Sequence, residues 1–285
     1  MADLALRSIL FVPGTRPDRF PKAFASGADA VVLDLEDAVE HSRKAEARRT
    51  VAEFLASRRL DAKRAAATFV RVNAPDSRAI DDDLPWARTI AGSIDAIVVP
   101  KVESALSLET IAEVAPDRHV IPLLETPRGI LDAPTILAAK AGIPAVLFGA
   151  EDLTASLGVP RTLEAVELLY ARSRIVLAAA TIGAEPIDAV WVNLNDPGGL
   201  ARDAEQARAL GFRGKLAVHP DQIATINAAF SPTALDIAEA QRIVDADDRA
   251  RASGDGAFRL NDQMVDAPVV ARARRVLARA ARLKS

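Results

Sequence analysis

Two carboxylates, Glu125 and Asp152, have the residue types and the spacing to hold one divalent cation. Each closely follows a short apolar run, VIPLL and AVLF, of the kind that forms a buried strand. Their separation is close to one unit of a (β/α)8 barrel, in which roughly 250 residues are divided among eight units. Two carboxylates facing one space suit Mg²⁺, which keeps positions for water and substrate. An acidic residue after a strand can instead cap the next helix.

Eight apolar runs alternate with helical patterns and are expected to be strands. They are Ser8–Val12, Ala30–Leu35, Thr68–Val72, Ala96–Val99, Val120–Leu124, Ala145–Phe148, Ile187–Val192 and Lys215–Val218. Alternating units with continuous apolar strands predict a parallel sheet covered by helices. Eight such units within about 220 residues favour an α/β fold of the TIM (β/α)8 barrel type over an open doubly wound sheet. The first turn, PGTRPDRF, also fits neither common nucleotide-binding fingerprint.

The alternation ends near residue 230. We expect a catalytic barrel over residues 1–230 and a C-terminal helical arm or lid over residues 231–285. The arm would contain a long charged helix at Thr233–Ala252, a glycine-containing turn with a short extended piece, and a basic amphipathic helix at Val269–Lys284. No barrel needs this segment, so it either braces the barrel surface or reaches over an active site.

Composition restricts the class of protein. Of 285 residues, 50% are hydrophobic and 26% are charged, as in ordinary globular proteins. A net charge of −3 gives no electrostatic basis for binding nucleic acid. The absence of cysteine excludes disulfides and thiolate chemistry, and three histidines argue against a histidine-rich zinc site. Without a signal-peptide pattern or an apolar stretch approaching about 20 residues, we expect a cytoplasmic protein that binds no membrane.

Six consecutive predicted strand ends carry ionisable residues, at the face where barrel enzymes do their chemistry. In chain order these residues are Arg16 and Arg19, then Asp34, Glu36 and Asp37, then Arg71, then Lys101 and Glu103, then Glu125, and finally Glu151 and Asp152. Surface loops are usually polar, but Arg71 lies within an apolar strand. A guanidinium group there must be paired or must bind an anion.

The motifs RSILFVPG, GADAVVLDLEDAV, VRVN, VVPKVES, LLET, FGAEDL and LGFRGKLAVHPDQI follow one another along nearly the whole chain. Together they resemble the citrate lyase β-subunit-like group of the HpcH/HpaI aldolase superfamily. The resemblance implies a TIM barrel, a Mg²⁺ ion for which Mn²⁺ can substitute, and carbon–carbon lyase chemistry on a thioester. It places the metal ligands at Glu125 and Asp152 and a substrate-binding arginine at Arg71. Glu36 and Asp37 would lie beside the metal and orient water and Arg71.

Members of this group that act on coenzyme A thioesters also carry a C-terminal arm with a VD-x-P motif, which QMVDAPVV matches. The resemblance therefore implies that Asp266 acts as an acid–base in the site of a neighbouring subunit. Such an arm requires a homo-oligomer, for which the family suggests a trimer or hexamer. Arg16 and Arg19 are candidates for binding the coenzyme A phosphates, because guanidinium groups match phosphate geometry. An ordinary salt-bridged first loop is the alternative.

The sequence thus predicts a Mg²⁺-dependent lyase that cleaves or forms a 3-hydroxyacyl-CoA thioester by a reversible Claisen-type step. Its substrates would be acetyl-CoA or propionyl-CoA and a 2-oxo acid such as glyoxylate or pyruvate, as in the malyl-CoA, β-methylmalyl-CoA and citramalyl-CoA classes. Alternatives are a citryl lyase β-subunit acting on a carrier-bound thioester, a metal aldolase for free 2-oxo-acid adducts, and a ligand-binding barrel without catalysis. The presence of Glu125, Asp152, Arg71 and Asp266 together argues against the last.

Overall fold

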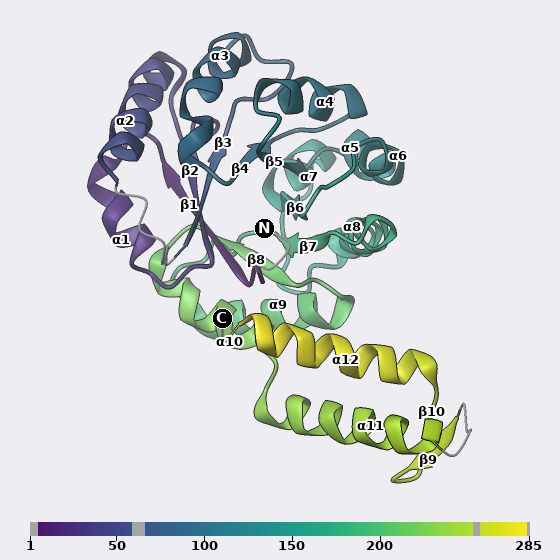
Figure 1. Ribbon diagram of the computed structural model, residues 1–285. Coiled ribbons are helices and arrows are strands. Elements are labelled where there is room, and N and C mark those ends of the chain that lie inside the picture. Colours follow the sequence, from purple (N-terminus) through teal and green to yellow (C-terminus); the bar gives the residue numbers. More distant parts are fainter. Residues whose placement is uncertain (1–4, 59–65, 253–256, 284–285) are drawn as a thin grey trace. The chain divides into compact units, whose positions relative to one another are not determined.

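The computed structural model describes residues 5–58, 66–252 and 257–283, and within them eight parallel strands close into a barrel (Figure 1). The strands are β1 (Ser8–Pro13), β2 (Ala30–Asp34), β3 (Ala67–Arg71), β4 (Ala96–Val99), β5 (His119–Leu124), β6 (Ala145–Phe148), β7 (Glu185–Asp188) and β8 (Gly214–Ala217). Each strand pairs with the next along the chain, and β1 closes the barrel by pairing with β8. The predicted TIM barrel is therefore confirmed.

Helices surround this barrel on its outer side (Figure 1). They are α1 (Phe20–Phe24), α2 (Lys44–Ser57), α3 (Ile80–Ile90), α4 (Ala105–Val114), α5 (Pro127–Leu131), α6 (Ala133–Ala138), α7 (Ala150–Leu157), α8 (Leu169–Ile182), α9 (Pro197–Leu210) and α10 (Ile223–Phe230). Because all eight strands are parallel, the residues just after each strand gather at one end of the barrel.

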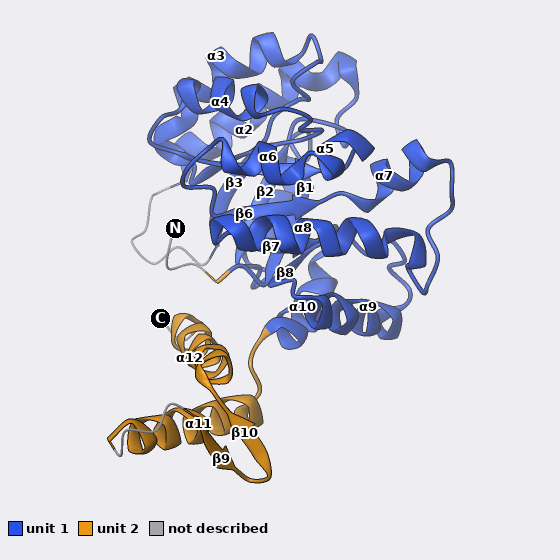
Figure 2. Ribbon diagram, turned by 90° about the vertical axis from the view of Figure 1, so that its right-hand side faces the viewer, with its two compact units in different colours: residues 1, 6–230 blue, residues 2–5, 231–285 orange. Residues whose placement is uncertain are grey.

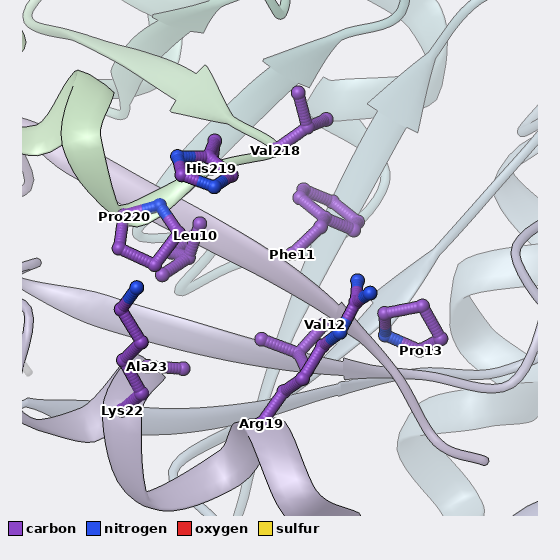
Figure 3. Close-up of a pocket in the computed structure, with 10 residues that line it drawn as sticks. All are labelled: Leu10, Phe11, Val12, Pro13, Arg19, Lys22, Ala23, Val218, His219 and Pro220. Carbon is purple, nitrogen blue, oxygen red and sulfur yellow. The ribbon is translucent and has the colours of Figure 1, made fainter. Parts of the chain in front are cut away.

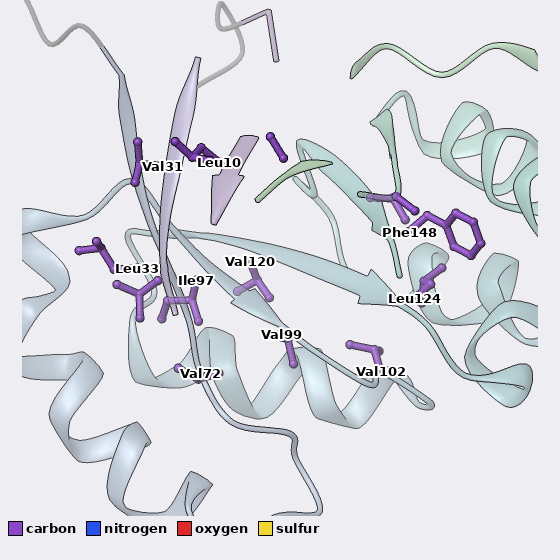
Figure 4. Packing of buried hydrophobic residues seen from close by; sticks show 14 of the residues in the cluster. Leu10, Val31, Leu33, Val72, Ile97, Val99, Val102, Val120, Leu124 and Phe148 are labelled. Atoms are coloured by element: carbon purple, nitrogen blue, oxygen red, sulfur yellow. The ribbon is translucent and has the colours of Figure 1, made fainter. Parts of the chain in front are cut away.

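Alternate residues of each strand enter two different apolar clusters. One set, which includes Val32, Phe69 and Leu123, fills the barrel interior. The other set, which includes Leu33 and Ile97, packs between the strands and the surrounding helices (Figure 4). This alternation follows from the two-residue period of a strand, whose successive side chains point to opposite faces. It also determines which strand-end residues point toward the barrel axis.

The seventh strand is shorter than predicted. The sequence pattern predicts Ile187–Val192, whereas β7 comprises Glu185–Asp188. Its ladder with β8 stops at the pair of Asp188 and Lys215, so the apolar residues that follow have no strand partner. Trp191 is nevertheless buried, because its ring packs closely against Gly199 in the first turn of α9. Trp191 is therefore buried under a helix without pairing in the sheet, and Val192, the last residue of the predicted strand, is exposed.

A buried ion cluster joins β7 and β8 to the helices outside them. The Lys215 ammonium group lies 2.6 Å from Asp188 and 2.5 Å from Asp203, and Arg172 contacts the same two carboxylates at 2.9 and 2.7 Å. Two cations thus balance two anions where water is excluded. Burial alone would raise the pKa of Asp203, but Lys215 and Arg172 outweigh this effect and lower it to about 2.

Of the described residues, 5, 231–252 and 257–283 form a second compact unit (Figure 2, orange). It consists of α11 (Ala234–Ala252), a hairpin of β9 (Phe258–Leu260) and β10 (Gln263–Val265), and α12 (Ala267–Arg282). The two helices pack against each other, and the buried Asp247 of α11 accepts from Arg251 and Arg274. Part of the predicted turn, residues 253–256, and the predicted helix end at Lys284 lie outside the described residues. Across the described ranges, every helix is too short or too polar to cross a membrane.

Candidate active site

Strands β2, β3 and β5 bring Asp34, Arg71 and Glu125 to the mouth of the barrel, the face where the carboxyl ends of the strands lie. Each residue comes two positions after a member of the interior cluster, so its side chain points toward the barrel axis. Asp34 and Arg71 are direct partners in the ladder between β2 and β3. Arg71 donates from Nε and Nη2 to the two oxygens of Asp34, each at 2.7 Å. This bidentate pair fixes the plane of the guanidinium group.

Arg71 is buried and forms a second ion pair, between Nη1 and Glu36 Oε2 at 2.8 Å. Burial alone would lower the pKa of Arg71, but Asp34 and Glu36 outweigh that effect and raise it. A guanidinium group has five N–H donors, and these contacts leave donors available for a ligand. The sequence indicates that Arg71 must be paired or must bind an anion, and the structure identifies Asp34 as a partner that the sequence does not reveal.

Glu125 is 2% exposed and is held from two sides. Its Oε1 accepts a hydrogen bond from the backbone N–H of Lys101 at 2.9 Å. Its Oε2 lies against Gly149, where an added Cβ would come within 2.3 Å of this oxygen. Burial first, and then the charge of Asp152, raise the pKa of Glu125 to about 8, although Arg71 opposes them.

Asp152 comes from the first turn of α7 and is about one-third exposed, unlike Glu125. Glu125 and Asp152 line the same cavity at the mouth, with a volume of about 370 Å³. Within the described ranges no three His, Cys, Asp or Glu side chains converge on one point, so the protein would offer two ligands to a metal. Two carboxylates with mutually unfavourable charges and an open space beside them fit the requirements of Mg²⁺.

Lys101 connects the remaining carboxylates of the mouth. Its ammonium group forms ion pairs with Glu36 and Asp37 and lies 3.7 Å from Asp152 Oδ1. The sequence places Lys101 among the charged strand ends but does not indicate a role for it. Its backbone has φ of 50°, which the residue type does not predict.

The cavity that Glu125 and Asp152 line is otherwise largely apolar. Its apolar lining includes Phe11, Leu123, Phe148, Val190, Leu216 and Val218. Two of these residues, Phe11 and Val218, also line a second cavity of about 240 Å³ beside β1 and β8. Figure 3 shows Arg19 and Lys22 extending from the first helical segment toward this second cavity. The two cavities are therefore neighbours that share an apolar boundary.

The other predicted site residues are not gathered at the mouth. Arg16 lines neither of these two cavities and instead donates to the exposed Asp18, at 2.9 and 2.8 Å. Asp266 belongs to the C-terminal unit, where it caps α12 by accepting from Val269 N at 3.4 Å. The roles proposed for both residues remain predictions.

A closed parallel barrel with acidic and basic side chains gathered at the strand ends is the arrangement found in TIM-barrel enzymes. The family model described as HpcH/HpaI aldolase/citrate lyase matches residues 7–220, and the chain belongs to this family. The predicted family and lyase class are thereby confirmed.

Relatives of the chain carry two kinds of name. This chain is 42% identical over 277 residues to a citrate lyase subunit beta-like protein of Deinococcus radiodurans, and the match covers 95% of this chain and 96% of that protein. It is 31% identical over 296 residues to the mitochondrial citramalyl-CoA lyase of Homo sapiens, covering 98% and 86% of the two chains. The names agree on a lyase and differ in the substrate.

The fold also matches a solved structure that contains ligands. The crystal structure of the protein CitE from Mycobacterium tuberculosis, in complex with magnesium, acetoacetate and coenzyme A, superposes with a TM-score of 0.81 at 37% identity. The match covers 98% of this chain and 99% of that one. Magnesium and coenzyme A, which the sequence predicts, are thus both bound by a close structural relative.

Proposed function

We propose that this chain is a Mg²⁺-dependent lyase that cleaves or forms the carbon–carbon bond of a 3-hydroxyacyl-CoA thioester by a reversible Claisen-type step. The observation that carries the proposal is the meeting of Glu125 and Asp152 in one cavity beside Arg71. Burial first, and then the charge of Asp152, raise the pKa of Glu125 to about 8, and a cation bound beside both carboxylates would offset these effects. The magnesium and coenzyme A in the M. tuberculosis relative support the same assignment.

Glu125 and Asp152 would be the protein ligands of the ion. When bound, Mg²⁺ supplies positive charge for the carboxylate and carbonyl oxygens of a 2-oxo acid. Arg71 directs its remaining N–H donors toward the thioester and steadies negative charge on the enolate oxygen. Because Asp34 and Glu36 already hold the guanidinium group, it needs no reorganisation during the reaction. Glu36 and Asp37 orient water and Arg71 from beside the metal.

The two neighbouring cavities suit the two ends of a coenzyme A thioester. Arg19 and Lys22 at the second cavity provide cationic groups for phosphate, and the shared Phe11 and Val218 give an apolar passage to the reacting end. Arg16 lies on the same first loop but is engaged by Asp18, so we assign it an outer contact with the phosphates at most.

Asp266 completes the mechanism as the acid–base. In the condensation direction it takes a proton from the α-carbon of the acyl group, which is the methyl carbon in acetyl-CoA. The resulting carbanion attacks the carbonyl carbon of the 2-oxo acid, whose oxygen then gains a proton and becomes the 3-hydroxyl group. We propose that the C-terminal unit of one subunit supplies Asp266 to the barrel of another, in a homotrimer or hexamer. This arrangement would also screen the reacting carbon from water.

A condensation assay tests the proposed function. Acetyl-CoA and propionyl-CoA are each incubated with glyoxylate, pyruvate or oxaloacetate and MgCl₂, and 3-hydroxyacyl-CoA products are measured by mass spectrometry. We expect product from at least one pair, and the preferred pair identifies the substrate class. An assay is needed for this choice, because contacts that distinguish substrates by one methyl group are worth only about 1–3 kcal/mol. Activity restricted to a carrier-protein thioester would favour a citryl lyase β-subunit. Cleavage of free 2-oxo-acid adducts without any thioester would favour a metal aldolase.

A further inference from the structure

Lys101 has a backbone conformation that its residue type disfavours. Among the described non-glycine residues, φ is positive at Lys101, Ala165, Asn261 and Asp262. Asn and Asp tolerate the left-handed region, because their short polar side chains bond locally, but lysine has no such compensation. Backbone strain of this kind persists where the surrounding structure imposes it, and it concentrates at functional sites. Glycine would fit the conformation better, so the lysine side chain must contribute something that glycine lacks.

The turn that carries Lys101 is held on both sides. The backbone N–H of Lys101 donates to Glu125 Oε1 at 2.9 Å. The next residue, Val102, is buried, and its carbonyl oxygen lies so close to Gly129 that an added Cβ there would be 2.2 Å away. The ammonium group therefore starts from a fixed point beside a metal ligand, and its reach is set by the length of the side chain.

The ammonium group engages carboxylates that Mg²⁺ would otherwise attract. Glu36 is shared between Arg71 and Lys101. Asp37 is about half-exposed, and in the described part of the chain Lys101 is the cation with which it pairs, at 3.1 Å. Asp152, the more exposed of the two candidate ligands, lies 3.7 Å from the same ammonium group. Free carboxylate oxygens this near to a divalent cation would be competent ligands for it.

We propose that Lys101 is a positioning residue that keeps Glu36 and Asp37 out of the coordination sphere of the metal. The protein ligands then remain Glu125 and Asp152, and the other coordination positions stay open for the oxygens of a 2-oxo acid. The ammonium charge also weakens the negative field that this anionic ligand meets as it enters. The inference rests on the proposed function for the metal and the 2-oxo acid, and it does not depend on the thioester.

Lys101→Met tests this role, because methionine keeps an unbranched side chain and the same backbone strain while it removes the charge. Isothermal titration calorimetry measures MgCl₂ binding alone, and then pyruvate binding in the presence of saturating MgCl₂. We expect Lys101→Met to bind Mg²⁺ on the order of tenfold more tightly, because a nearby positive charge is lost and Asp37 is freed. Pyruvate should bind at least about tenfold more weakly, because freed carboxylates occupy its positions and repel it.

Two further variants sharpen the test. Lys101→Arg keeps the charge and should stay close to wild type in both titrations. In Lys101→Met, Glu36 keeps its ion pair with Arg71, whereas Asp37 loses the cation with which it pairs. The double variant Lys101→Met with Asp37→Asn removes this released carboxylate, so it should regain much of the lost pyruvate affinity. Thermal unfolding by circular dichroism is recorded for every variant, since a merely structural lysine would lower the melting temperature and weaken both ligands together.

The outcomes separate this inference from the proposed function. Tighter Mg²⁺ with weaker pyruvate, reversed by Asp37→Asn, supports the role of Lys101. Weaker Mg²⁺ binding in Lys101→Met, or no change in either ligand, overturns that role and leaves the proposed function intact. Wild-type protein that binds neither MgCl₂ nor pyruvate overturns both.

Discussion

Gly149 lies against Glu125 so closely that a Cβ at position 149 would come within 2.3 Å of Glu125 Oε2 and 2.5 Å of Glu125 Cβ. Real Cβ atoms do not approach this near, so any larger residue must displace the carboxylate. Glu125 cannot yield easily, because its other oxygen is held by the backbone N–H of Lys101. Gly149, just after β6, therefore allows Glu125 to occupy its position in the site, although glycine carries no functional group.

Gly149→Ala should weaken Mg²⁺ binding at least about tenfold, because the alanine methyl group pushes Glu125 out of position. The same overpacking should lower the free energy of unfolding by about 1–3 kcal/mol. Calorimetry with MgCl₂ measures the effect. Gly92→Ala is the matched control, since an added Cβ there meets nothing within 4 Å. Equal Mg²⁺ affinity in the two variants would show that Glu125 is not a ligand held by this contact.

Arg71→Lys should reduce kcat by roughly 10²-fold or more, on the scale of removing one donor from an oxyanion site. Lysine keeps the charge but loses the planar fork that Asp34 holds at two points. Steady-state kinetics on the preferred substrate pair measures the loss. Arg43→Lys, which alters an exposed pair with Glu46, serves as the control and should leave the rate unchanged. A near-normal kcat for Arg71→Lys would mean that Arg71 is structural.

The barrel and several site residues could be predicted from the sequence for physical reasons. A buried parallel strand reads as a continuous apolar run, and most of the predicted strands agree with the structure within two residues at either end. The two-residue period then directs Arg71 and Glu125 toward the axis, since they follow Phe69 and Leu123 of the interior. Chemistry at strand ends is a property of the fold, so these residues could be recognised without coordinates.

Other features depend on relationships that the sequence does not state. Asp34 is important because the ladder register places it beside Arg71, and register is a matter of pairing between strands. Lys101 is important because its backbone has positive φ, which no pattern of residue types indicates at a lysine. The sequence predicts that the seventh strand ends at Val192, whereas β7 ends at Asp188, because Trp191 is buried by a helix and not by the sheet.

Asp203 makes the free energy of unfolding depend on pH in the acidic range. Its pKa in the folded protein is about 2, below the value of about 3.9 expected in the unfolded chain. A depressed carboxylate pKa stabilises the folded state above the unfolded pKa, and this contribution is lost as pH falls through the folded pKa. Asp203→Asn should therefore destabilise the protein by about 3–5 kcal/mol at pH 7, since it leaves Lys215 buried with one partner fewer.

Urea denaturation of wild type and Asp203→Asn between pH 7 and pH 2 measures this dependence. The difference in unfolding free energy should stay constant down to about pH 5 and shrink between about pH 4 and pH 2. Asp18→Asn is a control, because Asp18 is exposed and should change stability little at any of these pH values. A difference that persists unchanged at pH 2 would contradict the proposed role of the ion cluster.

Asp266→Asn should retain binding of Mg²⁺ and pyruvate and lose proton exchange at the α-carbon of the acyl group. Asparagine caps a helix as well as aspartate does, so α12 should remain folded, but an amide cannot accept the proton. The measurement is solvent-deuterium incorporation into the methyl group of acetyl-CoA in the presence of MgCl₂. Normal incorporation would reduce Asp266 to its observed role as a cap.

Mixing subunits tests whether Asp266 acts in a neighbouring barrel. Asp266→Asn and Glu125→Ala proteins are each expected to be inactive, but mixed oligomers would combine an intact barrel with an intact arm. Partial recovery of activity is therefore expected once labelled subunits are shown to exchange. Exchange without any recovery would place each arm over its own barrel.

The most direct test of the account is a Mg²⁺ titration of the cleavage reaction with protein freed of metal by a chelator. Wild-type protein should be inactive after this treatment and should regain carbon–carbon cleavage of its 3-hydroxyacyl-CoA substrate as MgCl₂ or MnCl₂ is added. Asp152→Asn should fold normally, because its side chain is partly exposed at the mouth, but it should require at least about tenfold more Mg²⁺ and remain slower at saturation. Full cleavage activity in excess chelator, or an Asp152→Asn protein with the wild-type dependence on Mg²⁺, would contradict the assignment of Glu125 and Asp152 as the ligands of a catalytic metal.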